Sequence, residues 1–307
     1  MSDLEDPAWE AKRAPSGGGL SEQRERLERH VTRLALEIGP RNIYHYEALQ
    51  AAAAFIAAAL TEAGHAPALQ RYEARGRSFV NIVAEITGSD RAGEIVVIGA
   101  HYDTHKNSPG ADDNGSAVAA LLELARHFGP RQTSRTLRFV AFANEEAPFT
   151  RRKDMGSRVY ARDCRQRGQT ITGMICLESI GYYAEESGSQ WLSLWGLLLP
   201  RQGDFLALVA NRPSRALLAR VAGTLQKASL PYRTMVLPTH FPGAWSSDHW
   251  SFWRESFPAL MVTDTAPLRN RHYHTREDTP DKVDFERLSR AVDDLKVAIA
   301  DLVSSEG

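Results

Sequence analysis

Two spacings of hydrophobic and polar residues alternate along this 307-residue chain. Apolar residues that recur every three or four positions predict helices, over residues 21–38, 44–63, 116–128, 157–167, 214–228 and 284 to about 303. Short runs rich in β-branched and aromatic residues predict strands, over residues 69–74, 79–86, 95–100, 137–142, 172–180, 205–209, 233–237 and 259–263. Strands that alternate with amphipathic helices indicate a sheet that is mostly parallel and covered by helices on both faces.

This pattern predicts an α/β fold, a single-domain α/β/α sandwich with a mixed, mostly parallel central sheet. We find no repeat and no linker within residues 21–307, so these residues are expected to form the one domain. Residues 1–20 read MSDLEDPAWEAKRAPSGGGL, which is acidic at its start and lacks the apolar core of a signal peptide. Its glycine-rich end predicts a flexible tail.

Composition excludes several classes of partner. The chain has 37 Lys and Arg against 38 Asp and Glu, a net charge of −1, so it lacks the basic field that nucleic acid or an anionic membrane would require. No apolar run is long enough to span a bilayer, which predicts a cytoplasmic location. Cys164 and Cys176 form no disulfide framework and no paired-cysteine metal motif. Composition leaves the oligomeric state open.

Histidines and carboxylates follow the predicted strands at their carboxyl ends. They are His101, Asp103, Asp112 and Asp113 after strand 95–100, Glu145 and Glu146 after 137–142, Glu178 within 172–180, and His272 and His274 after 259–263. Parallel strands bring these ends to one edge of the sheet, where α/β proteins bind ligands. The sequence therefore predicts a functional site at this edge.

So many carboxylates need a positive partner. No Lys or Arg lies within the segments GADDNGSA or NEE, and a pair of divalent cations would supply that charge. Histidine together with Asp and Glu suits zinc. GADDNGSA alone would also fit a turn and a helix cap, but the other strand ends favour metal.

At this point the chain resembles a known family. HYD, GADDNGSA, NEE, CLESIGYY, SDH and YHTREDTPDKVD, spread over residues 96–288, resemble the M28 family of co-catalytic zinc aminopeptidases. The resemblance implies two zinc ions per chain, with His101 and Glu178 on one, Glu146 and His274 on the other, and Asp113 bridging both. It also implies that Asp103 orients His101, that Glu145 is the general base, and that the Asp113–Asn114 peptide bond is cis.

Two departures from the family pattern stand out. Many members carry aspartate where this chain has Glu178, which reaches one methylene further. Some aminopeptidases place an oxyanion-binding tyrosine three residues before the serine of SDH, where this chain has Ala244. His240, Trp245 or Tyr273 would then take that role, and the sequence does not choose among them.

The expected function is an aminopeptidase that cleaves N-terminal residues from peptides, through a metal-bridged water with Glu145 as general base. Its partner would be a peptide or a small amide substrate. Alternatives on the same scaffold are a glutaminyl-cyclase-like acyltransferase, which resembles this fold but works with one zinc, and a carboxypeptidase or amidohydrolase. A non-catalytic binding protein is disfavoured because every ligand position is occupied by a competent side chain.

Several neighbouring residues keep two interpretations. Asp112 is expected to hydrogen-bond locally, and His272 to lie at the surface. Asp248 and His249 either support the site or are structural. Arg151, Arg152 and Lys153 form a solvated loop or attract an acidic end of the substrate, and the aromatic residues Trp245, Trp250, Phe252 and Trp253 wall a pocket or pack in the core.

Overall fold

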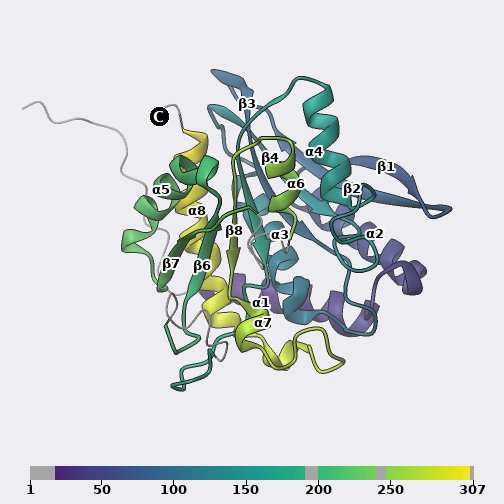
Figure 1. Cartoon of the computed structure of the whole chain (residues 1–307), viewed down its shortest axis with the longest axis vertical. Coiled ribbons are helices and arrows are strands. Elements are labelled where there is room, and N and C mark those ends of the chain that lie inside the picture. The colour runs from purple at the N-terminus through teal and green to yellow at the C-terminus, as the bar shows by residue number, and fades with distance from the viewer. Residues whose placement is uncertain (1–17, 191–199, 240–246, 305–307) are drawn as a thin grey trace, which may run out of the picture.

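The computed structural model describes residues 18–190, 200–239 and 247–304, and within them eight strands form one mixed sheet in the order β1-β2-β4-β3-β5-β8-β6-β7 (Figure 1). The strands are β1 (Ala68–Ala74), β2 (Arg77–Ile86), β3 (Arg91–His101), β4 (Arg135–Phe142), β5 (Thr170–Glu178), β6 (Leu206–Ala210), β7 (Tyr232–Val236) and β8 (Ala259–Thr263). The pairs β3–β4, β3–β5, β5–β8 and β6–β7 are parallel, and the other three pairs are antiparallel. The predicted α/β fold with a mixed sheet is confirmed.

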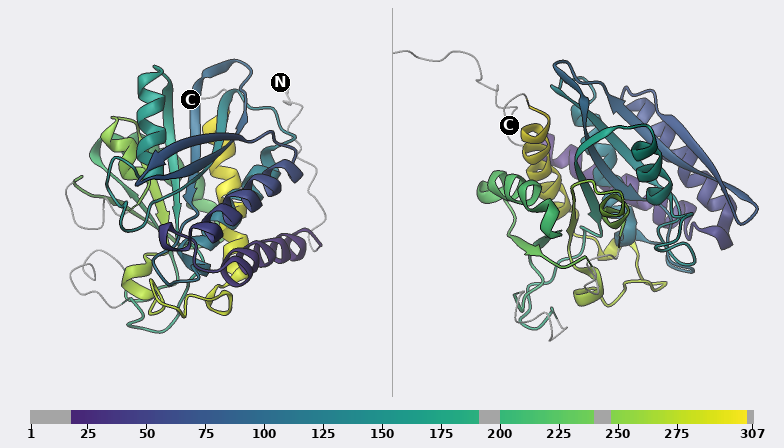
Figure 2. Two further views of the ribbon diagram at one scale, coloured as in Figure 1. Left: turned by 90° about the vertical axis from the view of Figure 1, so that its right-hand side faces the viewer. Right: turned by 45° about the horizontal axis from the view of Figure 1, so that its top comes forward.

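Helices cover both faces of the sheet (Figures 1 and 2). The α-helices of the described residues are α1 (Gly18–Thr32), α2 (Tyr46–Glu62), α3 (Ala117–Phe128), α4 (Gly156–Gln166), α5 (Arg215–Thr224), α6 (His249–Arg254), α7 (Ala266–Arg269) and α8 (Phe285–Val303). The helices α1, α2, α3, α5 and α8 share one apolar cluster with the sheet, and α4 and α6 share the other. Because α1 begins at Gly18, only residues 1–17 of the expected tail lie outside the described residues.

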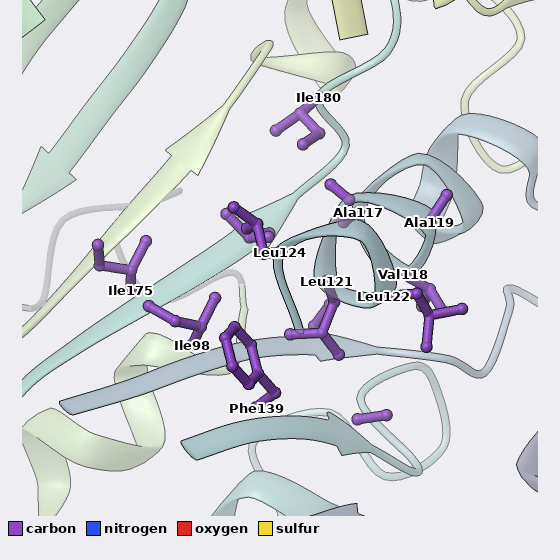
Figure 3. Packing of buried hydrophobic residues seen from close by; sticks show 14 of the residues in the cluster. Ile98, Ala117, Val118, Ala119, Leu121, Leu122, Leu124, Phe139, Ile175 and Ile180 are labelled. Atoms are coloured by element: carbon purple, nitrogen blue, oxygen red, sulfur yellow. The ribbon is translucent and has the colours of Figure 1, made fainter. Parts of the chain in front are cut away.

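The central strand β3 is apolar on both sides because both faces of the sheet are covered. Side chains alternate between the faces of a strand, so Ile95 and Val97 join the cluster beneath α4 and α6, while Val96 and Ile98 join the other. Figure 3 shows Leu121 of α3 turned toward Ile98 and Phe139. Burying each such side chain contributes about 1.5–3 kcal/mol, so the strands that carry the site are firmly held.

The four adjacent strands β4, β3, β5 and β8 all run in the same direction. Their carboxyl ends therefore meet at one edge of the sheet, where β3 ends at His101 and β5 ends at Glu178. Within the described residues, no helix combines the length and apolar character that crossing a lipid bilayer requires.

Candidate active site

All five predicted metal ligands meet at this edge, in two groups that share Asp113. The inner group is His101, Asp113 and Glu178, and the outer group is Asp113, Glu146 and His274; in each, the candidate ligand atoms lie within 4.8 Å of one another. His101 Nε2 lies 3.5 Å from Asp113 Oδ1 and 3.4 Å from Glu178 Oε2. His274 Nε2 lies 3.0 Å from both Asp113 Oδ2 and Glu146 Oε1. The two carboxylate oxygens of Asp113 thus face different groups.

The atoms that converge here fit a bound cation. His101 Nε2, His274 Nε2, Asp113 Oδ2 and Glu146 Oε1 are buried and have no hydrogen-bond partner in the described part of the chain. Buried polar atoms are otherwise nearly always hydrogen-bonded. Imidazole nitrogens together with carboxylate oxygens are a donor set that suits zinc.

Negative charge dominates the electrostatics of both groups. Burial alone would lower the pKa of His101, but Glu178, Asp103 and Asp113 raise it well above its usual value. Burial also opposes protonation of His274, yet Asp113 and Glu146 raise its pKa to about 10. Burial, reinforced by Asp113, raises the pKa of Glu146 to about 7. The site therefore attracts positive charge strongly, as a protein site for divalent metal must.

Asp103 connects two of the predicted motifs. Its backbone carbonyl lies 3.1 Å from His101 Nδ1, closer than its carboxylate Oδ1 at 3.6 Å. The carboxylate instead accepts hydrogen bonds from the backbone N–H groups of Glu145, at 2.9 Å, and Glu146, at 3.0 Å. Asp103 thus faces His101 mainly through its backbone, and its side chain holds the Glu145–Glu146 turn in place.

Glu145 and Glu146 point to different places although they are neighbours. Glu146 Oε1 faces His274, whereas Glu145 Oε2 lies 4.0 Å from His101 Nε2. The other oxygen of Glu145 is buried with no hydrogen-bond partner among the described residues. Burial raises the pKa of Glu145 well above its usual value, an effect that His101 partly offsets. A buried carboxylate beside the inner group is suitably placed to exchange a proton.

The segment that carries Asp113 is held by residues that the sequence argument missed. The carboxylate of Asp278 accepts hydrogen bonds from the backbone N–H groups of Asp112, at 2.9 Å, and Asp113, at 3.1 Å. The Asn114 side chain donates to the Leu177 carbonyl at 3.1 Å and accepts from the Ser179 N–H at 2.9 Å, which ties the segment to β5. The Asp113–Asn114 peptide bond is cis, as the family resemblance implied.

Arg41 supplies a cation that sequence spacing did not reveal. Its side chain is fully buried and donates to the backbone carbonyls of Leu34, Gly39, Tyr102, Pro109 and Gly110. Burial lowers its pKa to about 10 even though Asp278, Asp103 and Asp113 favour its charge. The charge of the carboxylates is therefore offset in part from the turn after the first helix. The only signal was the helix stop at Gly39-Pro40 directly before it.

The neighbouring residues for which the sequence allowed two interpretations differ in their contacts. Asp112 accepts one local hydrogen bond, from the Ser116 hydroxyl at 3.2 Å. It also accepts from the Gly181 N–H and the Asn270 side chain, both at 2.9 Å and both distant in the sequence. His272 is half-buried, lies 3.2 Å from Glu277, and belongs to neither group. Asp248 and His249 are fully buried at the start of α6, where the His249 ring packs edge-on against Trp253 at 4.5 Å.

Two of the three candidates for oxyanion binding, His240 and Trp245, lie outside the described residues. The third, Tyr273, stacks on His274 with ring centroids 3.8 Å apart. In the aromatic set, Phe252 and Trp253 are buried in the core, while Trp250 is half-buried against Arg158. Residues 151–153 are exposed.

Comparison with known proteins identifies related sequences. The model of peptidase family M28 matches residues 81–298. The uncharacterized protein YfbL of Escherichia coli (strain K12) is 35% identical over 280 residues, covering 88% of this chain and 85% of that protein. Leucine aminopeptidase 1 of Arthroderma otae is 29% identical over 254 residues, covering 76% of this chain but 61% of that protein.

Solved structures show the same fold. A zinc aminopeptidase from Bacillus subtilis superposes with a TM-score of 0.74 at 16% identity, covering 92% of this chain and 96% of that one. A glutaminyl cyclase from Fimbriiglobus ruber superposes with a TM-score of 0.66 at 20% identity, covering 91% and 95%. The family match spans more than half of the chain and contains all five candidate ligands. The chain therefore belongs to peptidase family M28 and is a metallopeptidase.

Proposed function

We propose that this protein is an aminopeptidase that holds two zinc ions and removes N-terminal residues from peptides. The observation that carries the proposal is Asp113, whose two carboxylate oxygens face two separate sets of ligands. His101 and Glu178 would complete one zinc site, and Glu146 and His274 the other. The sequence similarity to leucine aminopeptidases supports amino-terminal cleavage rather than another use of this fold.

Zinc, when bound, would polarise the scissile carbonyl and lower the pKa of the attacking water. The side chains have separate tasks around it. Glu145, buried beside the inner group and free of hydrogen bonds at Oε1 among the described residues, would accept a proton from the attacking water. It would then deliver that proton to the amine that leaves. Asp103 would hold Glu145 in position through the backbone bond it already makes.

The runner-up is a glutaminyl-cyclase-like acyltransferase with one zinc, and the fold alone does not separate it from an aminopeptidase. A carboxypeptidase or amidohydrolase would use the same metal centre on a different end of the substrate. Two complete ligand groups favour two metals and hydrolysis over the cyclase. The two readings therefore differ in a measurable number of zinc ions.

The deciding experiment combines a metal count with a substrate panel. Elemental analysis of the purified protein should find about two zinc ions per chain, following the two-metal arrangement. Aminoacyl chromogenic substrates should be cleaved, their N-acetylated forms should not, and a chelator should abolish the cleavage. One zinc per chain with cyclisation of N-terminal glutamine would establish the cyclase instead. Cleavage of acetylated substrates or of C-terminal residues would point to the other hydrolases.

A further inference from the structure

His274 is the ligand candidate with the least support from the sheet. It lies in the long loop after β8, its backbone has a positive φ of 61°, and its side chain is 32% exposed, against 12% or less for the other four. His101 has its second ring nitrogen held by a backbone carbonyl. No comparable hydrogen bond to His274 Nδ1 is present among the described residues. Metal-binding histidines usually need such a contact to fix the ring.

Two neighbouring rings hold the His274 ring in place of such a hydrogen bond. The Tyr273 ring stacks on one side of His274 with a centroid distance of 3.8 Å and an interplanar angle of 18°. The His105 ring stacks on His274 as well, with a centroid distance of 4.2 Å and an angle of only 5°. Because stacked rings resist rotation of the ring between them, this contact sets the direction of His274 Nε2.

His105 belongs to the loop after β3, which begins directly after His101 and also supplies Asp103. The loop is anchored from outside the site, since the Thr104 N–H donates to the Arg41 carbonyl at 3.0 Å. The Asn42 side chain donates to the carbonyls of Thr104, at 3.1 Å, and Lys106, at 3.0 Å. His105 therefore presents its ring from a fixed backbone, whereas His274 comes from a long loop.

His105 is not placed as a metal ligand itself. It is absent from both ligand groups of the described residues, and its Nδ1 is buried with no hydrogen-bond partner among them. Its ring instead meets His274 in two ways, by face-to-face stacking and by a hydrogen bond to the His274 backbone.

We infer that His105 is a positioning residue of the outer group, which holds the His274 imidazole aimed at Asp113 and Glu146 by stacking on it. The inference rests on the proposed function, because it takes His274 to be a zinc ligand. It assigns to the HYDTHK motif a second task besides supplying His101. We assign the role to the flat ring of His105 rather than to the hydrogen bond that the ring makes with the His274 backbone.

Three variants separate the ring from its nitrogens. His105→Phe keeps a flat ring without nitrogens, and His105→Ala and His105→Leu remove the ring, the second while filling its space. Zinc affinity is measured by competition with a chromogenic chelator. We expect His105→Ala and His105→Leu to lower the affinity for one of the two zinc ions about 10-fold. This is the lower end of the losses seen when a contact that orients a metal ligand is removed. His105→Phe should stay within about 3-fold of the wild type, since the stack remains.

His272→Ala is the matched control, because His272 lies in the same loop as His274 but in neither ligand group. It should leave both zinc affinities unchanged. Thermal unfolding in excess chelator should be the same for all variants, which separates a change at the metal from a change in folding. If His105→Leu binds both zinc ions like the wild type, or if His105→Phe is as weak as His105→Leu, the inference is overturned. If His274→Ala itself retains both zinc ions at full affinity, the ligand assignment of the proposed function fails instead.

Discussion

The inner and outer ligand groups are built in different ways although they share Asp113. The inner group is rooted in the sheet, since His101 ends β3 and Glu178 ends β5. Its side chains are held by hydrogen bonds, from His101 Nδ1 to the Asp103 carbonyl and from the Ser247 hydroxyl to Glu178. The outer group takes His274 from a loop, and ring stacking holds it. One site is thus set by two strand ends, and the other depends on a histidine from a loop that is partly exposed.

This difference indicates that the two groups release their metals at different rates. Opening the inner group would disturb strands whose side chains are packed on both faces, whereas opening the outer group needs only a movement of residues 271–277, which are exposed or half-buried. Local opening requires the least free energy where few buried contacts are lost. We therefore expect the outer zinc to exchange with solvent faster than the inner zinc.

The largest effect should follow from removing the residue that the two groups have in common. Asp113→Ala takes one ligand from each group, so both zinc ions and all activity above that of chelator-treated protein should be lost. Elemental analysis and an aminoacyl substrate assay test this together. A variant that keeps two zinc ions, or that keeps wild-type activity, would show that Asp113 does not bridge the groups.

Next in size is the separation of Glu145 from Glu146. Glu145→Gln removes the proton acceptor beside the inner group, so kcat should fall by about 10²–10⁴-fold while zinc content stays at the wild-type level. Glu146→Gln weakens an outer ligand, so zinc content should fall and added zinc should restore part of the activity. The check is the zinc-to-protein ratio measured beside kcat for each variant. Identical behaviour of the two variants would refute the division of roles.

The same contrast explains how far the sequence could be interpreted. The inner ligands and the Glu145–Glu146 pair follow strands whose apolar runs are plain in the sequence, and parallel strands bring their ends together. The predicted strands and long helices correspond to elements of the structure. The helices α6 and α7 were not predicted because six and four residues are too few to show a helical period. The order of strands in the sheet was also out of reach, since it depends on tertiary packing.

The residues that hold the ligands in place were largely missed. Arg41 reaches the Gly110 carbonyl 69 positions away, and Asp278 reaches the Asp113 N–H across 165 positions. No spacing rule connects such pairs, because chain folding alone brings them into contact. His105 lies only four residues after His101, yet its stack on His274 depends on where the distant loop settles. Motifs reveal which residues bind, while their supports appear only in three dimensions.

Of intermediate size is the kinetic difference between the two metals. Zinc release into excess chelator, followed by the absorbance of the chelator complex, should show a fast and a slow phase of equal amplitude for the wild type. His274→Ala should lose the fast phase and keep the slow one, because it damages only the outer group. His272→Ala should show both phases. A single phase in the wild type would mean that the two groups hold zinc equally firmly.

The smallest expected effect concerns the hydrogen bond that supports Glu178. The hydroxyl of Ser247 donates to Glu178 Oε2, and Ser179 approaches the other oxygen at 3.5 Å, so one contact remains when Ser247 is changed. Ser247→Ala should therefore lower the affinity only for the slowly released zinc, by about 10-fold, which is the lower end of the loss expected when a contact that orients a metal ligand is removed. Ser251→Ala is the matched control, since Ser251 is equally buried but bonds to Ser157 at 2.8 Å instead of a ligand. Competition with a chelator measures the zinc affinities of both variants. If Ser247→Ala instead releases the outer zinc faster and leaves the slow phase unchanged, Glu178 belongs to the outer group. The contrast between a metal held by the sheet and a metal held by a loop would then fail.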